Sequence, residues 1–255
     1  MPYLEFGGHR YYYAGDLRRK GIPLLFCHGS GGRHHHWLYQ IKGLKEKANP
    51  IAVDLPGHGR SEGAPCASVA GSRDWLHQFC RTAGLAQFVL AGHSLGGAIA
   101  LDYAIKHPGE ILGLVLVGSG GRLRVLPELL EELRAGRTPS ILHENLYGPA
   151  ASEELLEKGR KEMEETAAAV YYKDLCACDE FDVMEELPAI SQPVLIICGS
   201  EDRLTPVKYS RYLEEKIPRG EVRVIEEAGH MVMLENPERV NQVIAEFMTQ
   251  FTEGI

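Results

Sequence analysis

Residues 88–97 read Phe-Val-Leu-Ala-Gly-His-Ser-Leu-Gly-Gly, and this stretch decides how the rest of the chain is interpreted. Its first four residues are apolar and typical of a buried strand, whereas residues 98–101 favour a helix. A Gly-x-Ser-x-Gly sequence between a strand and a helix predicts a sharp turn that exposes the serine at its apex. Gly92 and Gly96 leave room there for the two backbones to approach each other. We therefore predict that Ser94 is a nucleophile.

A serine hydroxyl also needs donors for the negative charge that develops on the oxygen under attack. The helix that follows Ser94 directs free backbone amides toward this position, beginning with Leu95. A second amide should come from the loop after a neighbouring strand. The sequence His-Gly-Ser-Gly-Gly at residues 28–32 follows the apolar run 22–27 and fits this requirement. We predict that the backbone N–H groups of Leu95 and Ser30 form an oxyanion hole.

The serine needs a base, and the base needs a group that orients it. Of eleven histidines, His230 is the best placed, because it lies in the loop that leaves the carboxyl end of an apolar strand. The apolar run 194–198 leads into a second such loop, which contains Glu201 and Asp202. We assign Asp202 as the orienting acid, because a helix starts soon after it at Pro206, and Glu201 is its rival. The resulting order of nucleophile, acid and base is typical of hydrolases with a nucleophile elbow.

The substrate pocket should border the serine and the glycine-rich loop. His93 belongs to the turn itself, and residues 34–36 are three consecutive histidines at the start of a helix. These histidines cannot all face one metal ion, so we expect them to border the pocket or to solvate the end of the helix. The residues that we assign to substrate binding are Gly29, His34 and His93.

Composition and charge limit the classes of partner. The chain has 255 residues and a net charge of −8, which argues against nucleic acid. The N-terminus does not resemble a signal peptide, and no apolar run is long enough to span a bilayer. The six cysteines lie mostly in apolar runs, and Cys176 and Cys178 form a lone C-x-C. We expect a cytoplasmic protein with free thiols, no metal and no membrane partner, whose oligomeric state stays open.

Apolar strands alternate with amphipathic helices through most of the chain, which predicts an α/β fold with a mostly parallel sheet and helices on both faces. Residues 119–187 interrupt this alternation with charge-rich helical patterns, predicted near 126–134 and 152–176. Residues 120–187 hold sixteen acidic and eight basic residues, whereas the rest of the chain holds nineteen of each. We therefore divide the chain into a core, residues 1–118 and 188–255, and an inserted helical cap, residues 119–187.

With these residues identified, the chain resembles the α/β-hydrolase superfamily over essentially its whole length, as a capped member with a serine nucleophile like the esterases and lipases. The motifs that carry the resemblance are His28-Gly29, Asp54-Leu55-Pro56-Gly57-His58-Gly59-Arg60-Ser61, Gly92-His93-Ser94-Leu95-Gly96-Gly97, Gly199-Ser200-Glu201-Asp202 and Gly229-His230. The resemblance implies a mostly parallel sheet of eight strands, a helical cap (lid) after the sixth strand, and hydrolysis without a cofactor. It also implies a structural role for the turn at residues 54–61.

The expected activity is that of a carboxylesterase, which forms an acyl-enzyme and releases it with water. Serine in place of aspartate at the elbow disfavours dehalogenases and epoxide hydrolases. Carbon–carbon bond hydrolases, lactonases, thioesterases and cofactor-free perhydrolases use the same three residue types, and some members of the superfamily only bind ligands. The acidic residues of 119–187 would repel phosphorylated or CoA-linked substrates if they face the entrance, or else form a solvated outer surface. In the second case, the residues that line or support the pocket would be Leu129, Leu130, Leu133, Leu142, Leu146, Val170 and Tyr171.

Overall fold

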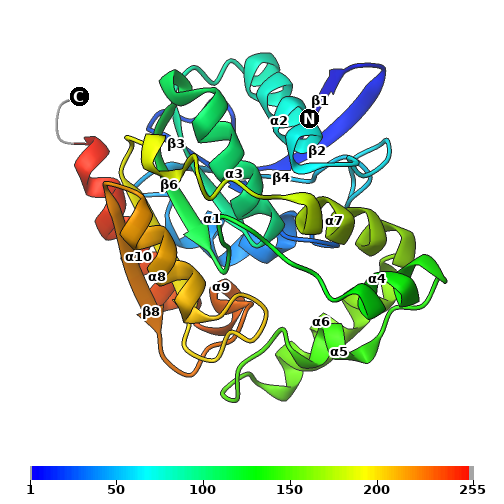
Figure 1. The fold of residues 1–255 in the computed structure, drawn as a ribbon. Coiled ribbons are helices and arrows are strands. Elements are labelled where there is room, and N and C mark those ends of the chain that lie inside the picture. The colour runs from blue at the N-terminus through cyan, green and yellow to red at the C-terminus, as the bar shows by residue number, and fades with distance from the viewer. Residues whose placement is uncertain (1, 253–255) are drawn as a thin grey trace.

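Strand β5 (Phe88–His93) lies near the middle of an eight-stranded sheet within residues 2–252, the part of the chain that the computed structural model describes (Figure 1). The strand order is β1-β2-β4-β3-β5-β6-β7-β8. The first two pairings are antiparallel, and the remaining ones are parallel. The other strands are β1 (Tyr3–Phe6), β2 (His9–Ala14), β3 (Pro23–Cys27), β4 (Asn49–Val53), β6 (Ile111–Val117), β7 (Val194–Gly199) and β8 (Gly220–Ile225). The predicted mostly parallel sheet is confirmed.

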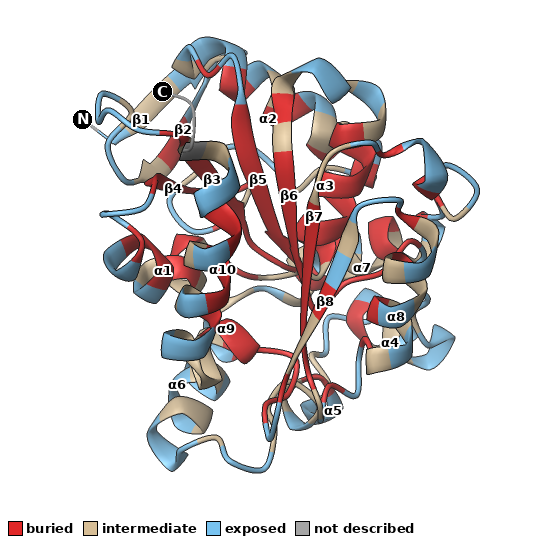
Figure 2. Ribbon diagram, turned by 90° about the vertical axis from the view of Figure 1, so that its left-hand side faces the viewer, coloured by how far each residue is buried: buried red, intermediate tan, exposed pale blue. Residues whose placement is uncertain are grey.

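Helices cover both faces of this sheet (Figure 2). Helices α2 (Val69–Ala83), α3 (Leu95–Lys106) and α8 (Val207–Lys216) pack on one face. Helices α1 (Leu38–Gly43), α9 (Val232–Glu235) and α10 (Pro237–Thr252) pack on the other. The short 3-10 helices are η1 (His34–Trp37), η2 (Pro108–Glu110) and η3 (Leu187–Ala189).

The continuous apolar sequence of β5 follows from its burial on both faces. Phe88 and Leu90 belong to the apolar cluster under α2 and α3, whereas Val89 and Ala91 belong to the cluster under α1 and α10. Successive side chains of a strand point to opposite faces, so a strand covered on both sides has no position for a polar residue. The strand therefore holds its carboxyl end, and the turn that follows it, in a fixed place in the core.

Four helices lie between β6 and β7 in the sequence, namely α4 (Pro127–Arg134), α5 (Ser140–Glu144), α6 (Glu153–Glu165) and α7 (Ala168–Glu180). Figure 1 shows them in green to yellow-green, grouped on one side of the molecule. The single helix predicted over 152–176 is wrong, because the chain is extended at Thr166 and Ala167. The Thr166 hydroxyl donates to the carbonyl of Glu162 at 3.1 Å, within the last turn of α6. The division of the chain into core and cap stays a prediction.

Gly92 marks the closest approach of β5 to α3. A Cβ atom at this position would overlap the backbone carbonyl of Gly96. We expect Gly92→Ala to lower the free energy of unfolding by at least about 3 kcal/mol, or the melting temperature by about 6 °C or more. Gly109→Ala is the matched control, because a Cβ there would meet nothing within 4 Å. Equal melting temperatures for the two variants, measured by calorimetry, would contradict this packing.

Candidate active site

Ser94 occupies the turn between β5 and α3 in a backbone conformation that non-glycine residues rarely adopt, with φ 52° and ψ −115°. Its amide donates to the Val117 carbonyl at 2.9 Å, and its carbonyl accepts from the Ser119 hydroxyl at 2.8 Å. These hydrogen bonds to the end of β6 hold the strained turn in place. The Ser94 side chain lines a cavity at the carboxyl edge of the sheet, where the sequence predicted it.

His230 and Asp202 come from the loops after β8 and β7 and form a buried pair. The His230 Nδ1 atom lies 2.9 Å from Oδ2 of Asp202. Burial alone would raise the pKa of Asp202, but the charge and hydrogen bond of His230, with hydrogen bonds from Thr205, lower it. The ionised carboxylate therefore accepts a hydrogen bond from Nδ1–H, which leaves Nε2 of neutral His230 with its lone pair.

Thr205 completes this arrangement and was missed by the sequence analysis. Its amide donates to Oδ1 of Asp202 at 2.8 Å, and its hydroxyl donates to Oδ2 at 2.7 Å. The amide of Leu204 also donates to Oδ1, at 2.9 Å. These donors fix the plane of the carboxylate, which in turn fixes the imidazole. The neighbouring residue Glu201, the rival acid, is exposed and contacts Ser200 instead.

Two adjoining cavities meet at Ser94 and His230. Leu142, Leu175 and Leu204 also border both. The first cavity has several polar side chains in its wall, which are Ser30, His36, Tyr147, Glu162 and Tyr171. Half of the residues that line the second are aliphatic, including Leu123, Val125, Leu126, Leu129 and Ile141, and its wall also holds Arg124 and Arg203. The arrangement offers a serine with room for a different chemical group on each side.

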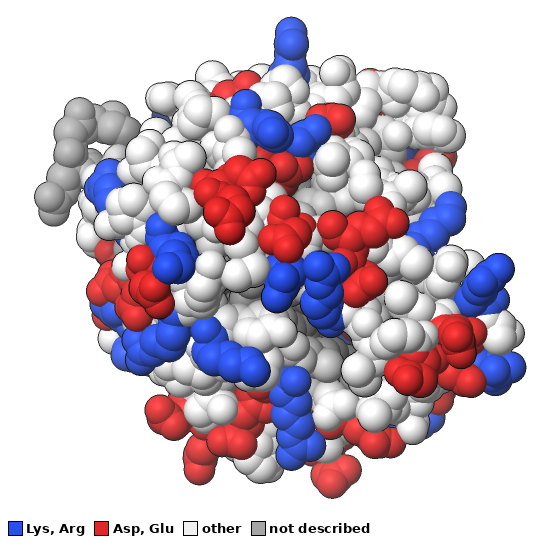
Figure 3. All heavy atoms as spheres, in the orientation of Figure 1, with Lys and Arg blue, Asp and Glu red and all other residues white. Residues whose placement is uncertain are grey.

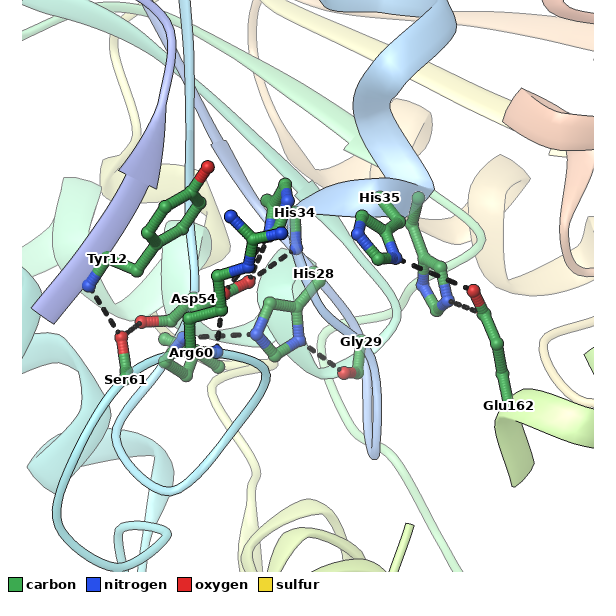
Figure 4. Close-up of polar contacts among 11 residues, drawn as sticks. Tyr12, His28, Gly29, His34, His35, Asp54, Arg60, Ser61 and Glu162 are labelled. Atoms are coloured by element: carbon green, nitrogen blue, oxygen red, sulfur yellow. Dashed lines mark hydrogen bonds and ion pairs between the residues drawn. The ribbon is translucent and has the colours of Figure 1, made fainter. Parts of the chain in front are cut away.

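Hydrogen bonds within the loop at residues 28–32 fix the orientation of one amide, that of Ser30. The Gly29 carbonyl accepts from Nδ1 of His28 at 2.8 Å (Figure 4). It also accepts from the Gly32 amide at 3.0 Å. Because Gly29 O and Ser30 N–H belong to one planar peptide unit, these bonds fix the direction of the Ser30 amide. Within residues 2–252, the amides of Ser30 and Leu95 donate to no other group. Both amides are therefore available as hydrogen-bond donors.

His28 can hold this carbonyl only as the neutral Nδ1–H tautomer. Its Nε2 atom accepts from the Leu55 amide at 3.1 Å. Burial, and the proximity of His58, lower the pKa of His28 to about 3. The ring therefore stays neutral throughout the pH range in which proteins usually work.

The structure corrects the assignment of His34 to the substrate pocket. This side chain is buried beside Asp54, with Nδ1 at 2.9 Å from Oδ1, and its amide donates to the same oxygen at 2.6 Å (Figure 4). A fully buried carboxylate needs several donors, and His34 and the Arg60 amide supply them. His36, two residues later, lines the cavity instead. Gly29 and His93 also line it, and Nε2 of His93 donates to the His230 carbonyl at 3.0 Å.

His36 and Glu162 form a polar wall that the sequence analysis missed. Nε2 of His36 lies 3.3 Å from Oε2 of Glu162, and Nδ1 of His35 lies 3.7 Å from Oε1. Burial would raise the pKa of Glu162, but the hydrogen bond and charge of His36, with the charges of Arg33 and His35, lower it to about 2. Figure 4 shows Glu162 reaching from a helix toward His35. No sequence signal links positions 36 and 162, which come together only through the fold.

Among residues 2–252, one group of three side chains has the donor atoms of a metal site, namely His77, His107 and Glu110. The imidazoles of His77 and His107 stack with an interplanar angle of 18°. Parallel rings direct their lone pairs side by side and not at one point, so this arrangement does not suit a metal ion. The carboxylate of Glu110 already accepts from Tyr103 at 2.6 Å.

The acidic excess of residues 120–187 does not form a single-sign surface on the face shown in Figure 3, where Lys and Arg lie among Asp and Glu. On α6, for example, Arg160 pairs with Glu157 at 2.8 Å. The leucines predicted to line or support the pocket occupy two kinds of position. Leu129, Leu142 and Leu146 border a cavity, whereas Leu133 is buried among the helices. No helix in residues 2–252 combines the length and the apolar character needed to cross a bilayer.

Comparisons with known proteins give matches over most of the chain. Residues 24–243 match the sequence pattern of the alpha/beta hydrolase family. A dihydrolipoyllysine-residue acetyltransferase component of an acetoin cleaving system from Pseudomonas putida is 30% identical over 245 residues. That match covers 89% of this chain and 64% of the relative, so the chain spans less than two thirds of that protein.

Solved structures extend the likeness to the whole fold. One described as a thermophilic esterase superposes with a TM-score of 0.84 at 33% identity, covering 97% of this chain and 96% of the other. Est816, described as an N-acyl homoserine lactone degrading enzyme, has a TM-score of 0.80 at 25% identity, covering 96% and 100%.

Proposed function

This chain belongs to the alpha/beta hydrolase family, and we propose that it is a serine hydrolase that cleaves small carboxylic esters through an acyl-enzyme. Ser94 is the nucleophile, His230 the general base and Asp202 the residue that orients His230. The observation that carries the proposal is the buried pair of His230 and Asp202, held 2.9 Å apart beside a cavity that His230 shares with Ser94. The likeness to a thermophilic esterase supports the choice of an ester.

The reaction proceeds in two steps. Nε2 of His230 takes the hydroxyl proton of Ser94 as Oγ attacks the ester carbonyl, and the tetrahedral intermediate collapses when His230 returns the proton to the leaving alcohol. Water then attacks the acyl-enzyme with His230 again as base, which releases the acid and regenerates Ser94. Asp202 stays ionised and stabilises the imidazolium formed in each step.

Substrate selection depends on the two cavities. An ester has an acyl and an alcohol portion, and the scissile carbonyl lies where the cavities join at Ser94. The aliphatic cavity accepts the more apolar portion, and the cavity with Tyr147 and Glu162 accepts a portion that forms hydrogen bonds. Helices α4 to α7 supply much of both walls, and on this basis we assign residues 119–187 as a cap over the site.

A panel of p-nitrophenyl esters of graded acyl length, with lactones and thioesters measured beside them, tests the reaction class. We expect the highest kcat/KM for a short or medium ester, with a burst of p-nitrophenol equal to the enzyme concentration when deacylation is slower than acylation. A lactone is the second candidate substrate, because of the likeness to Est816. Higher kcat/KM for lactones or thioesters than for every ester would reject the carboxylesterase assignment.

The oxyanion hole leads to a prediction about backbone and not side chain. Ser30→Ala keeps the amide and should retain most activity, whereas Ser30→Pro removes the donor. Loss of one such donor lowers kcat by about 10²- to 10³-fold. The melting temperature of Ser30→Pro has to be checked first, since proline also restricts the conformation of Gly29. A folded Ser30→Pro enzyme with unchanged kcat would mean that other groups bind the oxyanion.

A further inference from the structure

A buried carboxylate from α7 reaches the loop that carries the Ser30 amide. Asp174 is 3% exposed, and its Oδ2 atom accepts from the Gly31 amide at 2.8 Å. The same oxygen lies 2.9 Å from Nε2 of His58, which is also buried. Asp174 is separated from its two partners by more than a hundred residues. Neither Asp174 nor His58 lines either of the two cavities beside Ser94.

The hydrogen bonds of His58 define its protonation state. Its Nδ1 atom lies 2.9 Å from the Pro56 carbonyl, which can only accept, so Nδ1 carries a hydrogen. Nε2 faces a carboxylate oxygen, and a hydrogen bond there needs a second proton. His58 as an imidazolium meets both requirements. Burial lowers the pKa of His58, but the hydrogen bond and charge of Asp174 outweigh burial and raise it above the ordinary value of 6.5.

The other ionisable groups near this pair are neutral or are engaged elsewhere, so none of them takes the place of the Nε2 proton of His58. His28 lies 5.0 Å from His58 between ring centroids and is neutral, and Asp54 is engaged by His34 and Arg60. Burial raises the pKa of the Cys66 and Cys178 thiols, so they stay uncharged.

Helix α7 and Thr166, two residues before it, contact Gly31 at three points. Asp174 binds its amide, and the Thr166 hydroxyl, just before the helix, lies 3.5 Å from its carbonyl. The Tyr171 ring packs so closely that a Cβ at Gly31 would overlap it, and Gly31 has φ +63°. The Ser30–Gly31 peptide is thus fixed from the helix side, while His28 fixes the preceding Gly29–Ser30 peptide from the core side.

We propose that Asp174 and protonated His58 couple helix α7 to the oxyanion loop and act as positioning residues for the Ser30 amide. The inference rests on the proposed function, because it assigns a purpose to the orientation of that amide. Loss of the His58 proton at alkaline pH breaks the charged hydrogen bond and leaves Asp174 as an unpaired buried carboxylate. The contribution of this pair to folding stability is complete below pH 6.5 and is lost as the pH rises through the pKa of folded His58. Because the Ser30 amide is then held less firmly, activity falls in the same pH range.

Two substitutions at Asp174 separate charge from geometry. In Asp174→Asn the side-chain oxygen can still accept from the Gly31 amide, but it cannot also accept from a neutral His58 that donates to Pro56, so only the Gly31 hydrogen bond is kept. We expect kcat at neutral pH within about threefold of wild type, without the alkaline decline that depends on His58. Asp174→Ala removes both hydrogen bonds, and we expect kcat to fall at least about tenfold. This loss is smaller than the loss expected when the Ser30 amide itself is removed.

The control is Asp179→Ala on the same helix, because Asp179 anchors α7 to the Val125 amide at 3.0 Å and not to the oxyanion loop. A purely structural role for Asp174 would lower the melting temperature and raise KM with kcat unchanged, as expected of Asp179→Ala. A trifluoromethyl ketone forms an adduct that places an oxyanion in the hole. If Asp174 is a positioning residue, Asp174→Ala should weaken the binding of this ketone by the same factor as it lowers kcat. An Asp174→Ala enzyme with wild-type kcat and ketone affinity would overturn the proposal.

Two measurements do not depend on turnover and keep failure of this proposal distinct from failure of the proposed function. Nitrogen NMR of wild-type His58 should show both ring nitrogens protonated at neutral pH, and a neutral ring would overturn the proposal. Hydrogen exchange at the Gly31 amide should be slow in wild type and in Asp174→Asn, and fast in Asp174→Ala. Equal exchange rates in all three proteins would also overturn it, whether or not the enzyme cleaves esters.

Discussion

Ser94→Ala is expected to lower kcat for ester hydrolysis by about 10⁶-fold, because the variant retains the cavity and the oxyanion amides but has no atom that can form the acyl-enzyme. The fold should be unaffected, since the hydrogen bonds that hold the turn use the backbone of Ser94 and the Ser119 hydroxyl. Steady-state kinetics with a p-nitrophenyl ester, on protein whose melting temperature matches wild type, measures the effect.

Ser119→Ala is the control for Ser94→Ala. It removes a neighbouring hydroxyl that donates to the Ser94 carbonyl and leaves the nucleophile in place. Loss of one such hydrogen bond should change kcat by about tenfold or less. Turnover by Ser94→Ala within about tenfold of wild type would place the nucleophile elsewhere.

Asp202→Asn is expected to lower kcat by about 10⁴-fold, the loss seen for the corresponding change in serine proteases. The amides of Leu204 and Thr205 donate to Oδ1, so the asparagine carbonyl takes this place and its NH₂ group faces His230. His230 then has to accept at Nδ1 and carry its hydrogen on Nε2, where it cannot remove the serine proton. The substitution keeps the shape of the side chain, changes the tautomer of His230 and removes the negative charge that stabilises the imidazolium.

Glu201→Gln is the matched control for Asp202→Asn, since it makes the same chemical change one residue away on an exposed side chain. It should keep kcat within about twofold of wild type, as expected for a surface substitution. If Glu201→Gln were the damaging change and Asp202→Asn the mild one, the acid would be misassigned.

The strands and the turn at Ser94 could be predicted because their signals are local. An apolar run that is buried on both faces, such as β5, has no other stable environment, and glycines at positions 92 and 96 are required by backbone contact. The loops after β7 and β8 follow from the strand ends. Asp202 and His230 are hydrogen-bonded because parallel neighbouring strands bring their carboxyl ends together.

The remaining features depend on contacts between distant segments. Three consecutive histidines look alike in the sequence, and only the path of η1 directs His34 toward Asp54 and His36 toward the cavity. The pairing of Asp174 with Gly31 and His58 joins segments with no shared pattern. Thr166, at the break between α6 and α7, also lies beside this loop, with its hydroxyl 3.5 Å from the Gly31 carbonyl.

Labelling with a fluorophosphonate, followed by tandem mass spectrometry of the digested protein, tests the central claim most directly. The reagent reacts when an activated serine attacks phosphorus and expels fluoride, so it needs the nucleophile, its base and the oxyanion donors together. We predict a single adduct on Ser94 in the wild-type protein, strongly reduced labelling in Asp202→Asn, and none in Ser94→Ala. An unlabelled Ser94 in folded wild-type protein, or an adduct on another residue, would contradict the account.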